Sequence, residues 1–226
     1  MGSDDLFKRR KNARKERRSK AIELRNEQWL IVCEGAKTEP EYFRSLINDV
    51  NDKSNKKVIC EIKGTGKNTE TLVSHVDKLV QVDDETLRKH IPYAKVFVAF
   101  DKDSFREEQF NNAIYNALRS GYIPLWSNQC FELWFILHYE FMNSDLYRTQ
   151  YFKKLSGIFN CSYEKAADHY NMLGGMKRIR KAYENAKRLY NRYINEGETR
   201  PSKMAPCTTV FKLIDELESY TGTRIE

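Results

Sequence analysis

Short apolar segments alternate with amphipathic helical segments between residues 30 and 139, and this alternation restricts the fold more than any other feature. The predicted strands lie at residues 30–33, 58–62, 94–100 and 122–126, and the predicted helices lie at about 38–47, 69–82, 107–120 and 131–139. A chain that alternates strand and helix forms a mostly parallel sheet covered by helices. These strands are almost continuously apolar, which is typical of strands buried on both faces. We therefore predict an α/β fold.

A different pattern follows residue 145. Apolar side chains spaced 3, 4, 3, 4 and 3 residues apart predict a helix with one apolar seam, formed by Met176, Ile179, Tyr183, Ala186, Tyr190 and Tyr193. Three interpretations of this helix are open. It packs on the sheet with its basic sides in water, it binds along the phosphate backbone of a nucleic acid, or its seam joins a second copy of the chain in a homo-oligomer. A last helix is expected at about 209–219. We predict a core of residues 28–145 and a helical C-terminal extension of residues 146–226.

The net charge of +7 comes from one short segment. Residues 8–20 hold nine Lys or Arg and one Glu, so all other residues together carry a charge of −1. We expect residues 1–27 to be a disordered basic arm that binds a polyanion, nucleic acid first of all. A solvated tail that only aids solubility is the alternative. The candidate nucleic-acid-binding residues are Arg9, Arg10, Lys11, Arg14, Arg17 and Arg18 in the arm, and Lys177, Arg178 and Lys181 on the later basic helix.

Several classes of protein do not fit this sequence. No apolar run approaches the ~20 residues of a membrane-spanning helix, and the first residues lack the apolar region of a secretory signal. The five cysteines include no CxxC pair, so we expect reduced thiols, a cytoplasmic location and no zinc site. The glycine-rich segment 64–68 resembles a phosphate cradle but lacks the GxxxxGK[ST] pattern, so ATP binding is not predicted.

Acidic residues follow two of the predicted strands. Glu34 comes directly after the first strand, and Asp101 and Asp103 form a DxD sequence after the third. Ligands of parallel sheets bind at the carboxyl ends of the strands. If the third strand continues through the DxD, both aspartates lie on one face. Carboxylates without nearby histidines favour Mg²⁺ or Mn²⁺, which can stabilise charge on a phosphodiester, and Glu34 can complete the metal shell or exchange a proton.

Three further residues are candidates for the same site, each with an alternative interpretation. Glu132 is an additional carboxylate facing the metal, or a glutamate that interacts with the dipole of the helix it begins. Lys37 contacts a phosphate from the loop after the first strand, or is simply exposed. His138 polarises a phosphate or water, or is a core histidine with satisfied hydrogen bonds.

Specific motifs in these segments resemble a known family. The segments IVCEGAKTEPEYF, VFVAFDKDSF and SNQCFELWFILHYE, with PCTTVFKLIDEL near the end, resemble the RloB-like (abortive phage resistance, AbiLii-type) family. That resemblance implies a Toprim-related fold, in which the glutamate of the EG sequence is catalytic and the DxD aspartates hold metal; these are Glu34, Asp101 and Asp103 here. It also implies antiphage defence beside an ABC or SMC-like ATPase called RloA or AbiLi.

The residues and the resemblance together predict a metal-dependent nuclease with Mg²⁺ or Mn²⁺ as cofactor. Its substrate is DNA or RNA, tRNA included, and it is the effector of a two-component defence system. The chain has no room for the extra domains of topoisomerases or primases, which leaves phosphodiester cleavage among the Toprim activities. The alternative is a non-catalytic module that binds nucleic acid and the ATPase. A third interpretation is an activity that stays latent until the partner releases it.

Overall fold

The computed structural model describes residues 11–15, 26–66, 69–86, 93–165 and 167–226. Its strands are β1 (Gln28–Cys33), β2 (Ile59–Gly64), β3 (Lys95–Asp101), β4 (Ile123–Asn128) and β5 (Cys207–Thr208). Its helices are α2 (Thr38–Lys53), α3 (Thr69–Thr86), α4 (Glu107–Arg119), α5 (Glu132–Leu137), α6 (Arg148–Phe159), α7 (His169–Met172), α8 (Ile179–Asn195) and α9 (Phe211–Thr221), with 3-10 turns η1 (Gly175–Arg178) and η2 (Pro201–Lys203). The predicted alternation of strand and helix over the first half of the chain is confirmed.

The strands form one five-stranded sheet in the order β2-β1-β3-β4-β5. The first four are parallel, and β5 runs antiparallel to β4. The chain moves outward from β1 to β2 and then returns past β1 to β3, so β1 and β3 lie at the point where the winding direction reverses. In open α/β sheets, ligands bind at this switch point, beyond the carboxyl ends of the strands.

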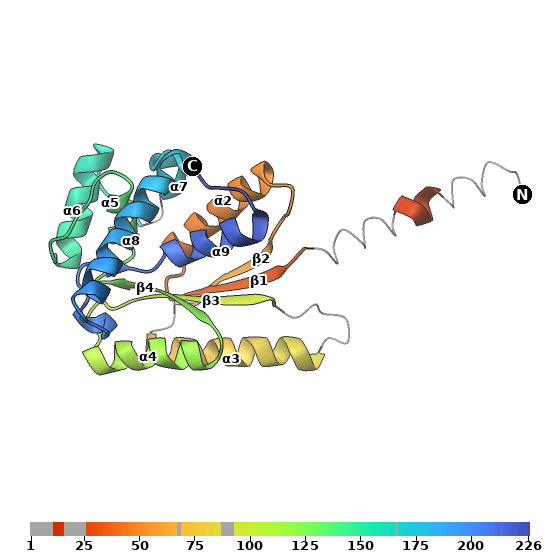
Figure 1. Ribbon diagram of the computed structural model, residues 1–226, viewed down its shortest axis with the longest axis horizontal. Coiled ribbons are helices and arrows are strands. Elements are labelled where there is room, and N and C mark those ends of the chain that lie inside the picture. Colours follow the sequence, from red (N-terminus) through yellow and green to blue (C-terminus); the bar gives the residue numbers. More distant parts are fainter. Residues whose placement is uncertain (1–10, 16–25, 67–68, 87–92, 166) are drawn as a thin grey trace, which may run out of the picture.

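Helices cover both faces of the sheet (Figure 1): α3 and α4 lie on one face, and α2 with the helices from α5 onward lies on the other. The strands contribute to both cores by alternation. Trp29 and Ile31 belong to the core beneath α2 and α5, while Leu30 and Val32 belong to the core over α3 and α4. Each fully buried large apolar side chain contributes roughly 1.5–3 kcal/mol to stability, so the buried positions of β1 hold the two helical layers against the sheet.

The predicted seam helix has a different start and a clear packing role. Met176 lies in η1, and the regular helix α8 begins only at Ile179. Ile179 and Ala186 are completely buried in the same core as α5. The interpretation as a helix packed on the sheet domain is therefore confirmed. The seam faces this chain's own core, so it is not a free surface for a second copy, and self-association stays a prediction.

The C-terminal half completes the sheet, which the sequence pattern did not predict. The N–H of Thr209 donates to the carbonyl of Trp126 (2.8 Å), and the N–H of Trp126 donates to the Thr209 hydroxyl (2.9 Å). Helices α6 and α7 were also not predicted. Core side chains from both sides of residue 145 pack together, and the division at that residue stays a prediction. Among the described helices, none has the length and apolar character needed to cross a bilayer.

Candidate functional site

A pocket of about 470 Å³ lies at the carboxyl edge of the sheet, where β1 and β3 end. We call it the carboxylate pocket, because charged side chains, most of them acidic, dominate its lining. Five of them are acidic: Glu34, Glu39, Asp101, Asp103 and Glu132. Three are basic: Lys37, Arg148 and Lys165. The excess of carboxylates means that the pocket attracts cations.

Glu34 and Asp101 are held together by the backbone of neighbouring strands. The N–H of Glu34 donates to the carbonyl of Ala99 (2.8 Å), so the chain after β1 stays against β3. The N–H of Asp101 in turn donates to Oε2 of Glu34 (3.2 Å). The predicted proximity of the EG glutamate and the first DxD aspartate is therefore confirmed.

Asp103 reaches the pocket by a different route from the predicted one. Strand β3 ends at Asp101, and Asp103 has a positive φ of 42°. Hydrogen bonds from the N–H of Lys102 to the carbonyl of Ser127 and from the N–H of Asp103 to the carbonyl of Gln129, both 2.9 Å, hold this turn against the chain after β4. The strand does not continue through the DxD, but a turn brings both aspartates to the same pocket.

Arg148 connects the two DxD aspartates, and the sequence analysis did not identify it. Its Nη1 donates to Oδ2 of Asp103, and its Nη2 lies 3.9 Å from Oδ2 of Asp101. Arg148 is the first residue of α6, a helix that has no apolar pattern strong enough to be recognised in the sequence. No local signal marks this arginine, because Asp103 lies 45 residues earlier in the chain and Asp101 lies earlier still.

Burial and mutual repulsion perturb the acidic groups. Burial raises the pKa of Asp101 well above its usual value, the carboxylates of Glu39, Glu132 and Glu34 raise it further, and Arg148 lowers it. Burial also raises the pKa of Glu39 to about 7, again with help from Glu132 and Glu34. Each group would be stabilised in its ionised form by an added cation.

Glu132 faces the pocket and is almost fully buried, with 2% of its surface exposed. Its Oε1 accepts a hydrogen bond from the hydroxyl of Tyr163 (3.0 Å). Its Oε2 is buried and has no hydrogen-bond partner among the described residues. An unsatisfied buried carboxylate oxygen is costly, so this geometry favours the interpretation as an additional carboxylate for a cation over that of a helix-end glutamate. The sequence analysis did not identify Tyr163.

Glu39 is a pocket carboxylate that the sequence analysis did not identify. It lies in the first turn of α2 and is 9% exposed. Gly35 lies directly against its carboxylate, so a Cβ at residue 35 would overlap Oε2 of Glu39. The glycine of the EG sequence therefore has a packing function: it makes room for an additional acidic group.

Lys37 and His138 have different fates. Lys37 is exposed and lines the carboxylate pocket beside the start of α2, and its contact with a phosphate stays a prediction. His138 is 1% exposed and does not line that pocket. Its Nδ1 bonds to the carbonyl of Trp134 (2.8 Å), and its Nε2 lies 3.3 Å from the hydroxyl of Tyr42. Burial lowers the pKa of His138 to about 4, so this side chain is a neutral core histidine and not a site residue.

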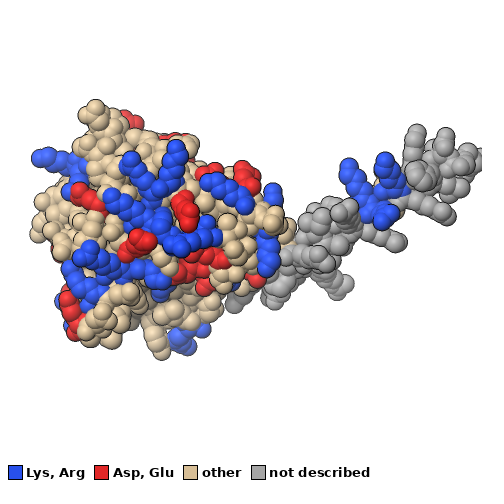
Figure 2. All heavy atoms as spheres, turned by 45° about the horizontal axis from the view of Figure 1, so that its top comes forward, with Lys and Arg blue, Asp and Glu red and all other residues tan. Residues whose placement is uncertain are grey.

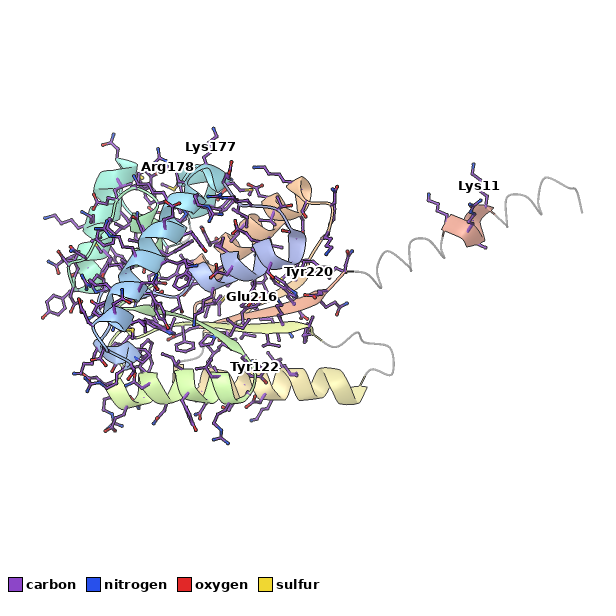
Figure 3. All side chains as sticks on the ribbon, in the orientation of Figure 1. Lys11, Tyr122, Lys177, Arg178, Glu216 and Tyr220 are labelled. Carbon is purple, nitrogen blue, oxygen red and sulfur yellow. The ribbon has the colours of Figure 1, made fainter. Side chains whose placement is uncertain are left out.

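The predicted nucleic-acid-binding residues are apart from the carboxylate pocket. Lys177, Arg178 and Lys181 line a separate hollow of about 380 Å³ with His138 and Tyr139. Arg178 stacks 4.2 Å from the ring centroid of Tyr139, and Figure 3 shows Lys177 and Arg178 at the outer edge of the helical layer. We call this cavity the basic hollow, after its three cationic side chains. Figure 2 shows many Lys and Arg side chains on this side of the molecule, with acidic side chains between them.

Most of the predicted arm lies outside the described residues. This applies to Arg9, Arg10, Arg17 and Arg18. Lys11 and Arg14 are described and exposed, within a helical segment of residues 11–15. The expected disorder of residues 1–27 stays a prediction.

The donor chemistry of the pocket fits a hard divalent cation, although its present geometry does not form a metal centre. The candidate ligands are all carboxylate oxygens, and one of them, Oε2 of Glu132, is buried without a partner. Within the described ranges, no group of three or more His, Cys, Asp or Glu side chains is arranged to hold a metal ion. A cation would therefore require the side chains to move, and above all Arg148 to release Asp101 and Asp103.

We compared the chain with protein-family models, curated proteins and solved structures. The family model described as RloB-like protein matches residues 29–217, which include every pocket residue named above. No curated protein and no solved structure matches the chain.

Proposed function

Because the chain belongs to the RloB-like family, we propose that it is a metal-dependent nuclease that acts in antiphage defence with an RloA-type ATPase. One observation carries the catalytic part of the proposal: carboxylates from the ends of three adjacent parallel strands converge at the switch point of the sheet. They are Glu34 after β1, Asp101 as the last residue of β3 with Asp103 after it, and Glu132 after β4. This is the place in an α/β fold where ligands are bound and where reacting groups are held by rigid elements.

A divalent cation such as Mg²⁺ or Mn²⁺, held by Asp101, Asp103 and Glu34, would stabilise the charge that develops on a phosphodiester during cleavage. The protein's own groups do the rest. Glu34 is positioned by the Asp101 N–H, and its carboxylate can exchange a proton with the attacking or leaving oxygen. Lys37, beside the N-terminus of α2, binds a phosphate oxygen together with the backbone N–H groups at that helix end.

Nucleic acid would be held by cations outside the carboxylate pocket. The basic hollow on η1 and α8 and the basic arm supply lysines and arginines for phosphate contacts. Such contacts depend strongly on salt and carry little sequence information. DNA, RNA and tRNA are therefore all substrates to be tested.

The cleavage experiment compares wild type with Glu34→Gln, with the ATPase present and absent. Plasmid DNA, single-stranded DNA, messenger-like RNA and tRNA are incubated with Mg²⁺, with Mn²⁺ and with EDTA. We expect cleavage that needs the metal and is lost in Glu34→Gln. Glu140→Gln is the matched control, because Glu140 is an exposed glutamate paired with Lys154 outside the pocket. Equal cleavage by wild type and Glu34→Gln would exclude Glu34 from the mechanism.

A non-catalytic module that binds nucleic acid and the ATPase is the second candidate. The ion pairs of Arg148 favour it, because they neutralise part of the charge a metal needs. Calorimetry with Mg²⁺ and Mn²⁺ on wild type and on the Asp101→Ala/Asp103→Ala double variant separates the two functions without a substrate. Saturable binding that the double variant loses supports the nuclease. Metal binding by neither protein, in the presence of nucleic acid and the ATPase as well, supports the module.

A further inference from the structure

We propose that Arg148 is a displaceable counter-ion of the carboxylate pocket, which neutralises Asp101 and Asp103 in the metal-free chain and leaves them when a divalent cation binds. This inference rests on the proposed function, since it concerns the same pocket. Arg148 contacts both DxD aspartates from α6, a helix separate from the strands that carry the pocket's acidic residues. The guanidinium therefore occupies the position next to the two carboxylates that a metal would need.

The closer ion pair, between Arg148 and Asp103, is open to water, whereas the Asp101 side chain is 11% exposed and lies farther from the guanidinium. The Arg148 side chain is 30% exposed and the Asp103 side chain is 36% exposed. Ion pairs that water can reach are weak, because the solvent screens the charges and the long side chains lose entropy when paired. A divalent cation bound by several carboxylates has a stronger interaction with the same oxygens, so it can displace the guanidinium.

The position of Arg148 on α6 allows the side chain to move without unfolding the helix. Arg148 is in the first turn, directly after the exposed Tyr147. The helix is anchored one turn and two turns later by the fully buried Tyr151 and Leu155. Rotation about the side-chain bonds of Arg148 changes neither anchor.

The guanidinium retains donor capacity for an anionic ligand. Its Nε is buried and has no hydrogen-bond partner among the described residues. A planar guanidinium can donate two parallel hydrogen bonds to a phosphate, which suits a phosphodiester. The metal thus competes for the aspartates of the ion pair, and the anionic substrate competes for its guanidinium. By linkage, each should increase the affinity of the pocket for the other.

Calorimetric titration of the full chain with Mn²⁺ tests the counter-ion role directly. Arg148→Gln removes the competing charge, so we expect it to bind Mn²⁺ on the order of tenfold more tightly than wild type in the absence of nucleic acid. The matched control is Lys165→Gln, which removes the same charge from the same pocket. No ion pair of Lys165 with an acidic residue is present in the described part of the chain, so its Mn²⁺ affinity should change much less.

A second measurement tests the coupling. A fluorescent single-stranded DNA 12-mer is titrated with protein at constant ionic strength, with and without saturating Ca²⁺, a hard cation that binds carboxylate oxygens. Wild type should bind the 12-mer several-fold more tightly with Ca²⁺, and Arg148→Gln should lose most of this gain. Thermal melting of both variants and of Arg148→Lys shows that each is folded.

The outcomes separate this inference from the proposed function. If wild type binds Mn²⁺ and Arg148→Gln binds it equally or less tightly, Arg148 is not a counter-ion, and the nuclease proposal stands. The same conclusion follows if Arg148→Gln and Lys165→Gln gain equally, because a general change of charge then explains both. If neither wild type nor folded Arg148→Gln binds Mn²⁺, with nucleic acid and the ATPase present as well, the pocket is no metal site, and both proposals fail.

Discussion

Gly35 lies against the carboxylate of Glu39, so the smallest side chain at residue 35 would overlap an oxygen of a buried acid. The same loop is crowded from its other side. A Cβ at Gly64 would come within 2.7 Å of the Ala36 carbonyl oxygen and 2.8 Å of the Gly35 carbonyl oxygen. The turn after β1 is therefore packed between β2 and the first turn of α2, which sets the position of Glu34.

These contacts predict different effects for substitutions of three glycines. Gly64→Ala forces backbone atoms apart and should lower the free energy of unfolding by about 1–3 kcal/mol in urea denaturation. Gly35→Ala displaces only the end of the Glu39 side chain, so it should disturb metal binding more than stability. Gly157→Ala is the control, because it lies within α6 with no atom near its Cβ, and it should stabilise the protein by up to ~1 kcal/mol. Equal destabilisation by all three would contradict this packing account.

The hydrogen bond from Asp101 to Glu34 predicts a separation of stability from activity. Glu34→Gln keeps an oxygen that accepts this bond, so its free energy of unfolding should stay within ~0.5 kcal/mol of wild type. Glu34→Ala loses the acceptor and should be destabilised by about 1 kcal/mol. Both variants should lose at least about a hundredfold in cleavage rate, because both lack the carboxylate. Urea denaturation and a cleavage assay on the same preparations make the comparison.

The raised pKa of Glu39 predicts that the free energy of unfolding decreases as the pH rises above the usual pKa of a glutamate. Below pH 4.5 the folded and unfolded chains both keep the proton. Between pH 4.5 and about 7 only the folded chain keeps it, so the free energy of unfolding falls as the pH rises. Glu39→Gln removes this loss, which is on the order of 3 kcal/mol at most. The variant should thus be more stable than wild type at pH 8 and equally stable at pH 4. A gain that is the same at both pH values would argue against a buried, ionisable Glu39.

The lowered pKa of His138 predicts the opposite dependence of the free energy of unfolding on pH, in the acidic range. Its folded pKa is about 4 against an ordinary value of 6.5, so the unfolded chain takes up a proton first. The free energy of unfolding should therefore fall as the pH drops from 6.5 to about 4. His138→Gln abolishes this slope, at a cost of about 1–3 kcal/mol for the altered hydrogen bonds to Trp134 and Tyr42. Between pH 4.5 and 6.5 the contributions of Glu39 and His138 oppose each other, so each is measured as the difference between its variant and wild type.

The basic hollow predicts a salt-dependent loss of nucleic-acid binding without loss of fold. Lys177→Ala/Lys181→Ala should weaken binding of a DNA or RNA duplex and reduce the slope of log affinity against log salt by about 1–2. Lys203→Ala is the control, since Lys203 is paired with Glu107 outside the hollow. Unchanged slopes in fluorescence anisotropy titrations would mean that the hollow does not contact the phosphate backbone. Binding would then depend on the arm, which a deletion of residues 1–27 tests in the same assay.

The amino-acid pattern was enough to predict the four parallel strands of the sheet and the two acidic motifs at their ends, but not the fifth strand. Apolar runs such as 96–100 are signals contained within a few consecutive residues, because a strand segment buried on both faces is almost continuously apolar. The carboxyl ends of parallel strands share one edge, so Glu34 and Asp101 could be placed together without any knowledge of the packing.

The other groups that complete the pocket could be identified only from the folded chain. Arg148 meets Asp103 across 45 residues, and Tyr163 meets Glu132 across 31, and no local periodicity encodes contacts of this kind. His138 and Glu132 were ambiguous in the sequence because both belong to one apolar helix. The packing of α5 against α2 directed His138 into the core and left Glu132 facing the pocket. Charge near a sheet edge is visible in a sequence, but the pairing of those charges depends on distances that only the folded chain sets.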